Sequence, residues 1–157
     1  MKHDLFLIAI ALSLTWLMVG CAQAPAQNPR LGLEFPAHNL TFCVEVADTP
    51  KMIERGLMFR TRMDESGGML FEMGRTSRQP FWMYHTLIPL DAVFLDERLQ
   101  VVDVAAMVPC ASEDPRACAR YLPKADMRYV LEVKGGLAAK FGIIPGEPVL
   151  LTNTSRC

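Results

Sequence analysis

The strongest hydrophobic pattern in the chain lies between residues 90 and 108. Two runs of apolar and β-branched residues, 90 to 95 and 99 to 108, stand on either side of the turn-like letters DER. This arrangement is typical of a β-hairpin. Both faces of the first run are apolar apart from Asp91, so it predicts a strand in the centre of a sheet.

Weaker patterns predict more strands and two brief helices. Residues 39 to 46 alternate between apolar and polar, the period of a half-buried strand, and we expect this strand to open the domain. Thr49 and Pro50 have the residue types of a helix start, and Gly142 those of a helix end. The remaining apolar runs are GGMLFEM, which a polar loop at residues 74 to 80 follows, then YVLEV and the end of IPGEPVLLT. The fold class we predict is mostly β: a compact single-domain barrel or sandwich with two short helices.

The N-terminus has the pattern of a targeting segment. Lys2 is followed by an apolar run from residue 5 to 19, which is shorter than the roughly 20 residues of a spanning helix. The letters LMVGC, ending at Cys21, resemble the bacterial lipobox, and an ordinary secretory signal is the alternative. We therefore expect a lipoprotein signal peptide at 1–20, with palmitate-type acylation of Cys21 holding the protein to a membrane. In a Gram-negative host, Ala22 favours the periplasmic face of the outer membrane.

Residues 21–32 are rich in Ala, Gln and Pro, so we expect a flexible tether, and a single domain over 33–157. The net charge is −1, which does not favour a nucleic-acid partner. Export would allow disulfides among the four remaining cysteines. Cys110 and Cys118 flank a short polar loop and form the pair we expect, whereas Cys43 and Cys157 could pair or stay free. The cysteine spacing does not favour zinc, and we expect neither a metal site nor a cofactor.

Several motifs in order resemble the Domain of Unknown Function 192 family. They are ERGLMFR at residues 54 to 60, GGMLF at 67 to 71, FWMYHTLIPLDAVFLD at 81 to 96, MVPC at 107 to 110 and YVLEV at 129 to 133. The resemblance implies a compact, mostly β domain, often exported, without an established biochemical role. The family usually has lysine and asparagine where this chain has Tyr84 and His85, so a role for His85 would be particular to this protein.

Within the third motif we expect a core strand from residue 81 onward. Asp91 would be a carboxylate at the beginning of the central strand, and Arg55 or Arg60 would be its partner, because an unpaired buried charge is costly. Its expected role is to hold a helix against the sheet, and that of a general base is the alternative. Trp82 and Tyr84 would share one face of the extended segment, and rings of this size line cores or pockets.

Three functions fit these residues. The first is a non-catalytic binding or interaction module for an envelope protein or small ligand, with a groove formed by Arg55, Trp82, Tyr84 and His85. The second is a hydrolase that uses His85 and Asp91, which would have to meet in one cleft. The third is a periplasmic copper carrier that uses Met83 and His85, since thioether and imidazole suit Cu(I), although gap-filling in the core also explains the methionines.

Overall fold

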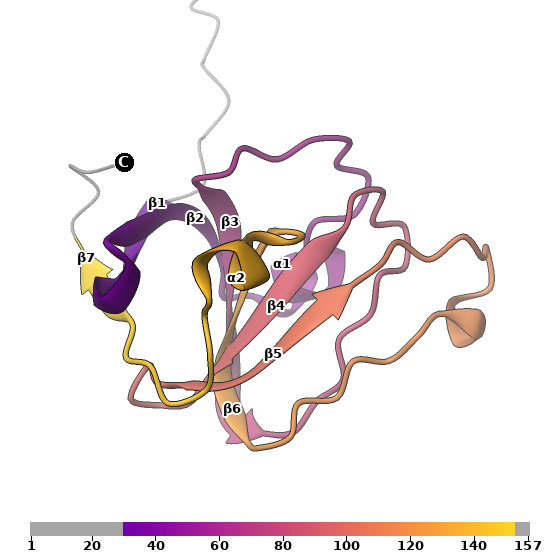
Figure 1. The fold of residues 1–157 in the computed structure, drawn as a ribbon. Helices are drawn as coiled ribbons and strands as arrows, with labels where there is room; N and C mark the ends of the chain where they lie inside the picture. Colours follow the sequence, from indigo (N-terminus) through magenta and orange to yellow (C-terminus); the bar gives the residue numbers. More distant parts are fainter. Residues whose placement is uncertain (1–29, 153–157) are drawn as a thin grey trace, which may run out of the picture.

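The computed structural model describes residues 30 to 152, which form one curled, half-barrel sheet (Figure 1). The strand order is β5-β4-β6-β3-β2-β1-β7. The strands are β1 (Arg30–Phe35), β2 (Leu40–Ala47), β3 (Gly67–Ser77), β4 (Leu90–Leu95), β5 (Val101–Met107), β6 (Met127–Lys134) and β7 (Leu150–Thr152). The α-helices are α1 (Pro50–Arg55) and α2 (Leu137–Phe141). The prediction of a mostly β domain with two short helices is confirmed, and the expected hairpin is β4 and β5.

The segment before β7 links the two edges of the sheet. Val101 of β5 donates a backbone hydrogen bond to Glu147 O at 2.9 Å and accepts one from Gly146 at 2.8 Å. The chain then continues into β7, which pairs antiparallel with β1 at the opposite edge. The connection keeps the sheet curled, because it ties the first strand of the sheet to the last.

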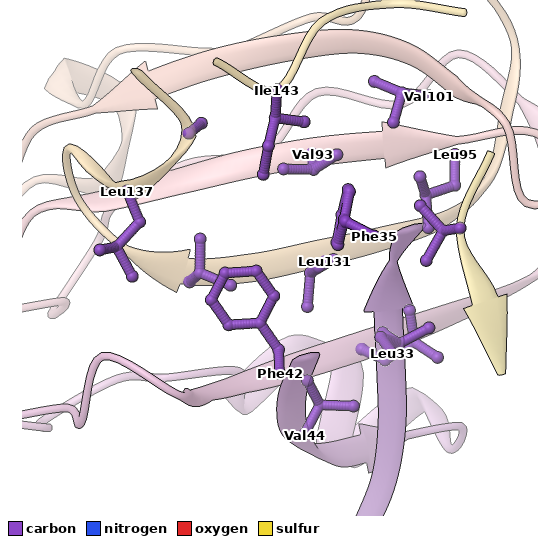
Figure 2. Close-up of a cluster of buried hydrophobic side chains, with 14 residues drawn as sticks. Leu33, Phe35, Phe42, Val44, Val93, Leu95, Val101, Leu131, Leu137 and Ile143 are labelled. Atoms are coloured by element: carbon purple, nitrogen blue, oxygen red, sulfur yellow. The ribbon is translucent and has the colours of Figure 1, made fainter. Parts of the chain in front are cut away.

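Both faces of the sheet carry a hydrophobic core. The core beside α2, the α2-side core, is drawn in Figure 2. Its buried members are Leu33, Phe35, Phe42, Val44, Leu70, Val93, Leu95, Val101, Leu131, Val133, Leu137, Ala138, Ile143 and Val149. The α1-side core contains Ala47, Leu57, Met69, Phe71, Phe81, Met83, Leu90, Ala92, Phe94, Met107, Met127 and Val130. Side chains of a strand alternate between faces, so β4 contributes to both cores, and every residue in it is buried, as expected of a central strand.

The predicted helix boundaries are correct. Thr49 accepts a hydrogen bond from the Met52 N–H at 3.3 Å, and Pro50 is the first residue of α1. Gly142 ends α2 in the left-handed conformation with φ of 71°. In the described part of the chain, no helix has the length and apolar character needed to cross a membrane.

The sheet begins earlier than the sequence pattern indicated. Strand β1 precedes the strand that we expected to open the domain, and its first three residues, 30 to 32, belong to the segment predicted as a tether. Gly32 pairs with Thr152 of β7, which packs where a side chain on residue 32 would lie. Strand β3 also continues to Ser77, into residues expected to be a loop, where it pairs with Met127 after an irregularity.

Asp91 holds a helix against the sheet, but the helix and the partner differ from those predicted. Its Oδ2 accepts a hydrogen bond from the backbone N–H of Ala138 in α2 at 2.8 Å, and the residue is 2% exposed. The expected pairing with Arg55 or Arg60 was wrong, because Asp91 points to the α2-side core while α1 lies on the other face. Arg60 donates instead to Glu45 on β2, with a nitrogen to oxygen distance of 2.7 Å.

We expect Asp91→Ala to lower the free energy of unfolding by about 2 kcal/mol or more, because it leaves the Ala138 N–H buried without its charged acceptor. Asp91→Asn retains an acceptor oxygen and should lose less. Urea unfolding of the full chain measures both, with the exposed Asp126→Ala as control, for which we expect a change within about 0.5 kcal/mol. Equal losses for Asp91→Ala and Asp126→Ala would contradict the assigned role.

Candidate functional site

The segment at residues 81 to 89 is a loop, so the expected core strand was wrong there. Phe81 makes an isolated antiparallel bridge with Tyr121, and Thr86 donates a backbone hydrogen bond to Met83 O at 3.1 Å, which closes a turn. His85 within that turn has φ of 52°, a left-handed conformation that reverses the chain. Phe81 and Met83 are buried in the α1-side core, so this loop is held by packing and not by a strand ladder.

Three of the predicted site residues lie in a row of contacting rings at the surface. The ring centroids of Trp82 and Tyr84 are 5.6 Å apart, and those of Tyr84 and His85 are 3.8 Å apart. His85 also stacks on Phe59, with centroids 4.9 Å apart. At the other end of the row, the Arg120 guanidinium lies 4.0 Å from the Trp82 ring centroid. We call these five residues the aromatic row.

A disulfide-closed loop contacts the aromatic row through Tyr84. Cys110 and Cys118 are bonded, as predicted, with their Cα atoms 5.4 Å apart. Tyr84 donates from its hydroxyl to the Glu113 carbonyl in this loop, with the oxygens 3.4 Å apart. The loop therefore restricts the position of the row. The sequence left open whether Cys157 pairs with Cys43, and Cys157 lies outside the described range.

A cavity of about 180 Å³ lies between α1, the outer part of β3 and the loop at residues 79 to 86. Of the residues expected in the binding groove, Arg55, Trp82 and Tyr84 line it, whereas His85 does not, nor do Arg60 and Asp91. Its walls are polar and apolar in nearly equal parts. The apolar lining residues include Ile53, Leu57, Met58, Phe71, Met73 and Phe81, and the polar ones include Gln79 and Thr86.

Glu132 also lines this cavity, and sequence reasoning missed it. It follows Val130 by two positions on β6, so its side chain is on the α1 face, beside Met69 of β3 and Ala92 of β4 in the register. Ala92, the small residue that pairs with Glu132 on β4, leaves room on the α1 face of the sheet. The signal that could have found it is an acidic residue within the apolar run YVLEV, at a position where a central strand would bury it.

The Glu132 carboxyl group is desolvated and has no partner in the described part of the chain. The residue is 4% exposed, and within residues 30 to 152 no hydrogen bond or ion pair engages its side chain. Burial disfavours the charged form and raises its pKa from 4.5 to about 8. At neutral pH the group is therefore mostly a neutral acid, able to donate one hydrogen bond and accept others.

A shallower hollow of about 400 Å³ continues from the mouth of the cavity. The two share Glu54, Arg55 and Met58 from the α1 region together with Trp82 and Tyr84. The hollow adds Lys51, Phe59 and Pro115. The site thus has a smaller cavity of mixed polarity, with the buried Glu132 in its wall, and a larger, mostly apolar hollow outside it.

The residues of the two alternative functions do not assemble in the same way. Asp91 binds the backbone of α2, and the His85 ring packs between Phe59 and Tyr84. Met83 is 1% exposed, and its side chain belongs to the α1-side core. The cavity brings together three of the four residues expected in the binding groove, Arg55, Trp82 and Tyr84, and adds Glu132.

The raised pKa of Glu132 predicts a stability that falls with pH. Between pH 4.5 and about 8 the unfolded carboxyl is ionised while the folded one keeps its proton, so unfolding releases a proton and is favoured as the pH rises. Glu132→Gln should remove this slope and stabilise the fold at pH 8, by up to about 4 kcal/mol.

Urea unfolding between pH 5 and 8.5 tests this expectation. Glu54→Gln, an exposed carboxylate at the mouth of the same cavity, is the matched control and should follow the wild-type pH dependence. Parallel stability curves for Glu132→Gln and the wild type would mean that Glu132 ionises normally in the folded state.

Two solved structures with the same fold are similar to this chain in sequence. A protein of unknown function from Novosphingobium aromaticivorans DSM 12444 is 33% identical, with a TM-score of 0.69, over 82% of this chain and 94% of the other. A candidate transcription regulator from Sinorhizobium meliloti 1021 is 31% identical, with a TM-score of 0.66, over 78% of this chain and 92% of the other. Among curated proteins none matches significantly.

The family comparison covers nearly all of the described sheet. The model of DUF192, described as "Uncharacterized ACR", matches residues 33–151, from β1 to β7. All the motifs that carried the resemblance lie within that range, as does Glu132. The chain therefore belongs to the DUF192 family.

Proposed function

We propose that this protein is a lipid-anchored envelope protein whose domain binds a small molecule without transforming it. The binding site is the cavity between α1 and the loop at residues 79 to 86. The observation that carries the proposal is the carboxyl group of Glu132, which lines the cavity, is 4% exposed and has no partner among residues 30 to 152.

The composition of the cavity supports ligand binding. Small-molecule sites are typically concave and mostly apolar, with a few polar groups that orient the ligand. Burying a polar group without a hydrogen-bond partner costs free energy, and a ligand that supplies the partner recovers part of it. Such a group in a cavity is a common mark of a functional site. Glu132 has this character, whereas the equally buried Asp91 already has its partner in α2.

Binding is better supported than hydrolysis. A hydrolase needs a second group that activates water or a nucleophile next to the acid. The other titratable side chains at the cavity are Glu54, Arg55 and Tyr84, and the first two are exposed at its mouth. His85 and Asp91 have separate surroundings, which weakens the alternative that uses them as acid and base. The copper alternative is weakened because the Met83 thioether is part of the core.

The location of the protein rests on the sequence alone. The lipobox-like letters at residues 17 to 21 lie outside the described range, and the lipid anchor and the envelope location are part of the proposal. The description of the Sinorhizobium protein refers to that protein, and the net charge of −1 gives no support for nucleic-acid binding by this chain.

We expect the anchor to depend on Cys21. In a bacterial host that exports and acylates lipoproteins, wild-type chain should be found in the membrane fraction, and Cys21→Ala should remove it from that fraction. Metabolic labelling with a fatty acid gives the second readout. Membrane association without any label on the wild-type chain would contradict lipidation.

Binding should depend on the wall formed by Trp82. We expect native mass spectrometry of the full chain to show a retained small molecule, or one taken up from an envelope extract. Trp82→Ala should reduce its occupancy about tenfold, as expected for a lost aromatic contact. Leu122→Ala removes an exposed apolar side chain away from the lining residues and is the control.

The molecule released after denaturation should have the same mass as the molecule that was added. Conversion into a product would support the enzyme alternative. An envelope extract that yields no bound molecule would contradict the binding proposal, provided that circular dichroism shows the chain to be folded.

A further inference from the structure

We propose that the cavity takes an ammonium group, so that the ligand is a primary or alkylated amine whose apolar or aromatic part lies in the adjoining hollow. This inference rests on the proposed function and names the ligand class of the same site. Three observations support it: the buried group is an acid, aromatic rings and thioethers line the cavity, and the cavity is small.

The buried group is acidic, and no buried base opposes it. Among the described residues that line the cavity, Arg55 is the basic side chain, and it is exposed at the mouth beside the equally exposed Glu54. Water screens these two charges, whereas the carboxyl of Glu132 is nine-tenths or more buried. An ammonium group that enters can replace the proton of this acid, and the carboxylate so formed accepts a charge-assisted hydrogen bond, which is strong in a medium of low dielectric constant.

The walls attract positive charge. Phe71, Phe81, Trp82 and Tyr84 contribute aromatic rings, whose faces carry partial negative charge. Trp82 already has the Arg120 guanidinium 4.0 Å from its ring centroid, so this ring accepts a cation in the protein itself. The thioethers of Met58 and Met73, also at the cavity, are polarizable and carry no charge. A carboxylate ligand would gain no attraction from the ring faces, and a neutral alcohol would gain little from them.

The dimensions favour a small head group. The cavity of about 180 Å³ is below the roughly 300 to 1,000 Å³ of sites that enclose a drug-sized ligand. The hollow of about 400 Å³ outside it, with Phe59 and Pro115, is mostly apolar. An amine with an alkyl or aryl substituent of modest length would place its nitrogen near Glu132 and its remainder over Trp82 and Tyr84.

Binding of an ammonium group changes the protonation of Glu132. The free carboxyl, with a pKa of about 8, is mostly protonated at pH 7. When the cation binds, the O–H proton leaves to solvent, and the carboxylate accepts a hydrogen bond from the ammonium N–H. Each binding event at pH 7 therefore releases close to one proton, and affinity increases as the pH rises from 6 to 8. The other titratable groups facing the cavity are Glu54, Arg55 and Tyr84.

Three probes of nearly the same shape test the ligand class. They are 2-phenylethylamine, 2-phenylethanol and 3-phenylpropanoate, which are a cation, a neutral molecule and an anion at pH 7. After removal of the proposed signal peptide at residues 1–20, which contains Trp16, Trp82 is the single tryptophan of the mature chain, and its fluorescence is the reporter. We expect the amine to bind at least about tenfold more tightly than the alcohol and the anion.

The variants separate the carboxyl group from the rest of the site. Glu132→Gln should weaken the amine about tenfold or more and leave the alcohol within about threefold, whereas Glu97→Gln, at an exposed position that lines neither the cavity nor the hollow, should leave both within about threefold. Calorimetry in two buffers of different ionisation enthalpy should show the release of a proton in the wild type and none in Glu132→Gln. Glu132→Gln has the shape of the neutral acid, so we expect it to fold.

The outcomes distinguish this inference from the proposed function. If the alcohol or the anion binds as tightly as the amine, or if Glu132→Gln leaves the amine affinity unchanged, the ammonium proposal is overturned and binding in the cavity stands. If none of the probes changes the Trp82 fluorescence at millimolar concentration, the ammonium proposal is also overturned. In that case the envelope-extract experiment decides on the proposed function independently.

Discussion

Burial of the central sheet on both faces is the constraint on which the rest of this structure depends. All residues of β4 are buried, and its neighbour β6 contributes Leu131 and Val133 to one core and Val130 to the other. Each face of the sheet must therefore be covered by other segments of the chain. On one face, α2 and the segment before β7 cover it. On the other face, α1 and the loops at residues 57 to 63 and 79 to 89 cover the sheet. Any polar side chain in the middle of this sheet needs a partner from one of these coverings.

Two carboxyl groups lie in the middle of this sheet. One has a hydrogen-bond partner, and the other has none among the described residues. Asp91 pairs in register with Val133, and the next rung of the same ladder pairs Ala92 with Glu132. The two acids are 2% and 4% exposed, and they point to opposite faces. On the α2 side the backbone N–H of Ala138 satisfies Asp91. On the α1 side the covering leaves a cavity, and Glu132 has no partner within the described residues.

This difference separates a structural role from a functional one. A satisfied carboxylate adds to stability, whereas a desolvated acid held neutral by its surroundings reduces stability as the pH rises through the neutral range. Sites that bind or react commonly retain such unfavourable groups because a ligand can satisfy them. The supporting parts around Glu132 are ordered by long-range contacts. The disulfide loop holds Tyr84, the Arg120 guanidinium covers one face of Trp82, and Gly56 ends α1 beside Phe71.

The sequence by itself determined the parts of this protein that depend on neighbouring residues. The hairpin of β4 and β5, the helix start at Thr49, the helix end at Gly142 and the disulfide between Cys110 and Cys118 all follow from residue type and spacing. The motifs also indicated the family, and three of the four residues expected in the groove, Arg55, Trp82 and Tyr84, lie at the cavity. Each of these inferences uses contacts within a few residues of the chain, or a pattern that recurs in many proteins.

Only the tertiary structure decided which side of the sheet each element covers. The partner of Asp91 is 47 residues away in α2, and the local pattern contained nothing to favour it over Arg55 or Arg60. Residues 81 to 89 have the composition of a strand, yet they form a loop because the positions beside β4 are taken by β5 and β6. Glu132 lies within the apolar run YVLEV, where the sequence pattern did not single it out. Whether a carboxyl in such a run is paired or faces a cavity depends on how distant segments pack above it, and sequence spacing carries no information on that packing.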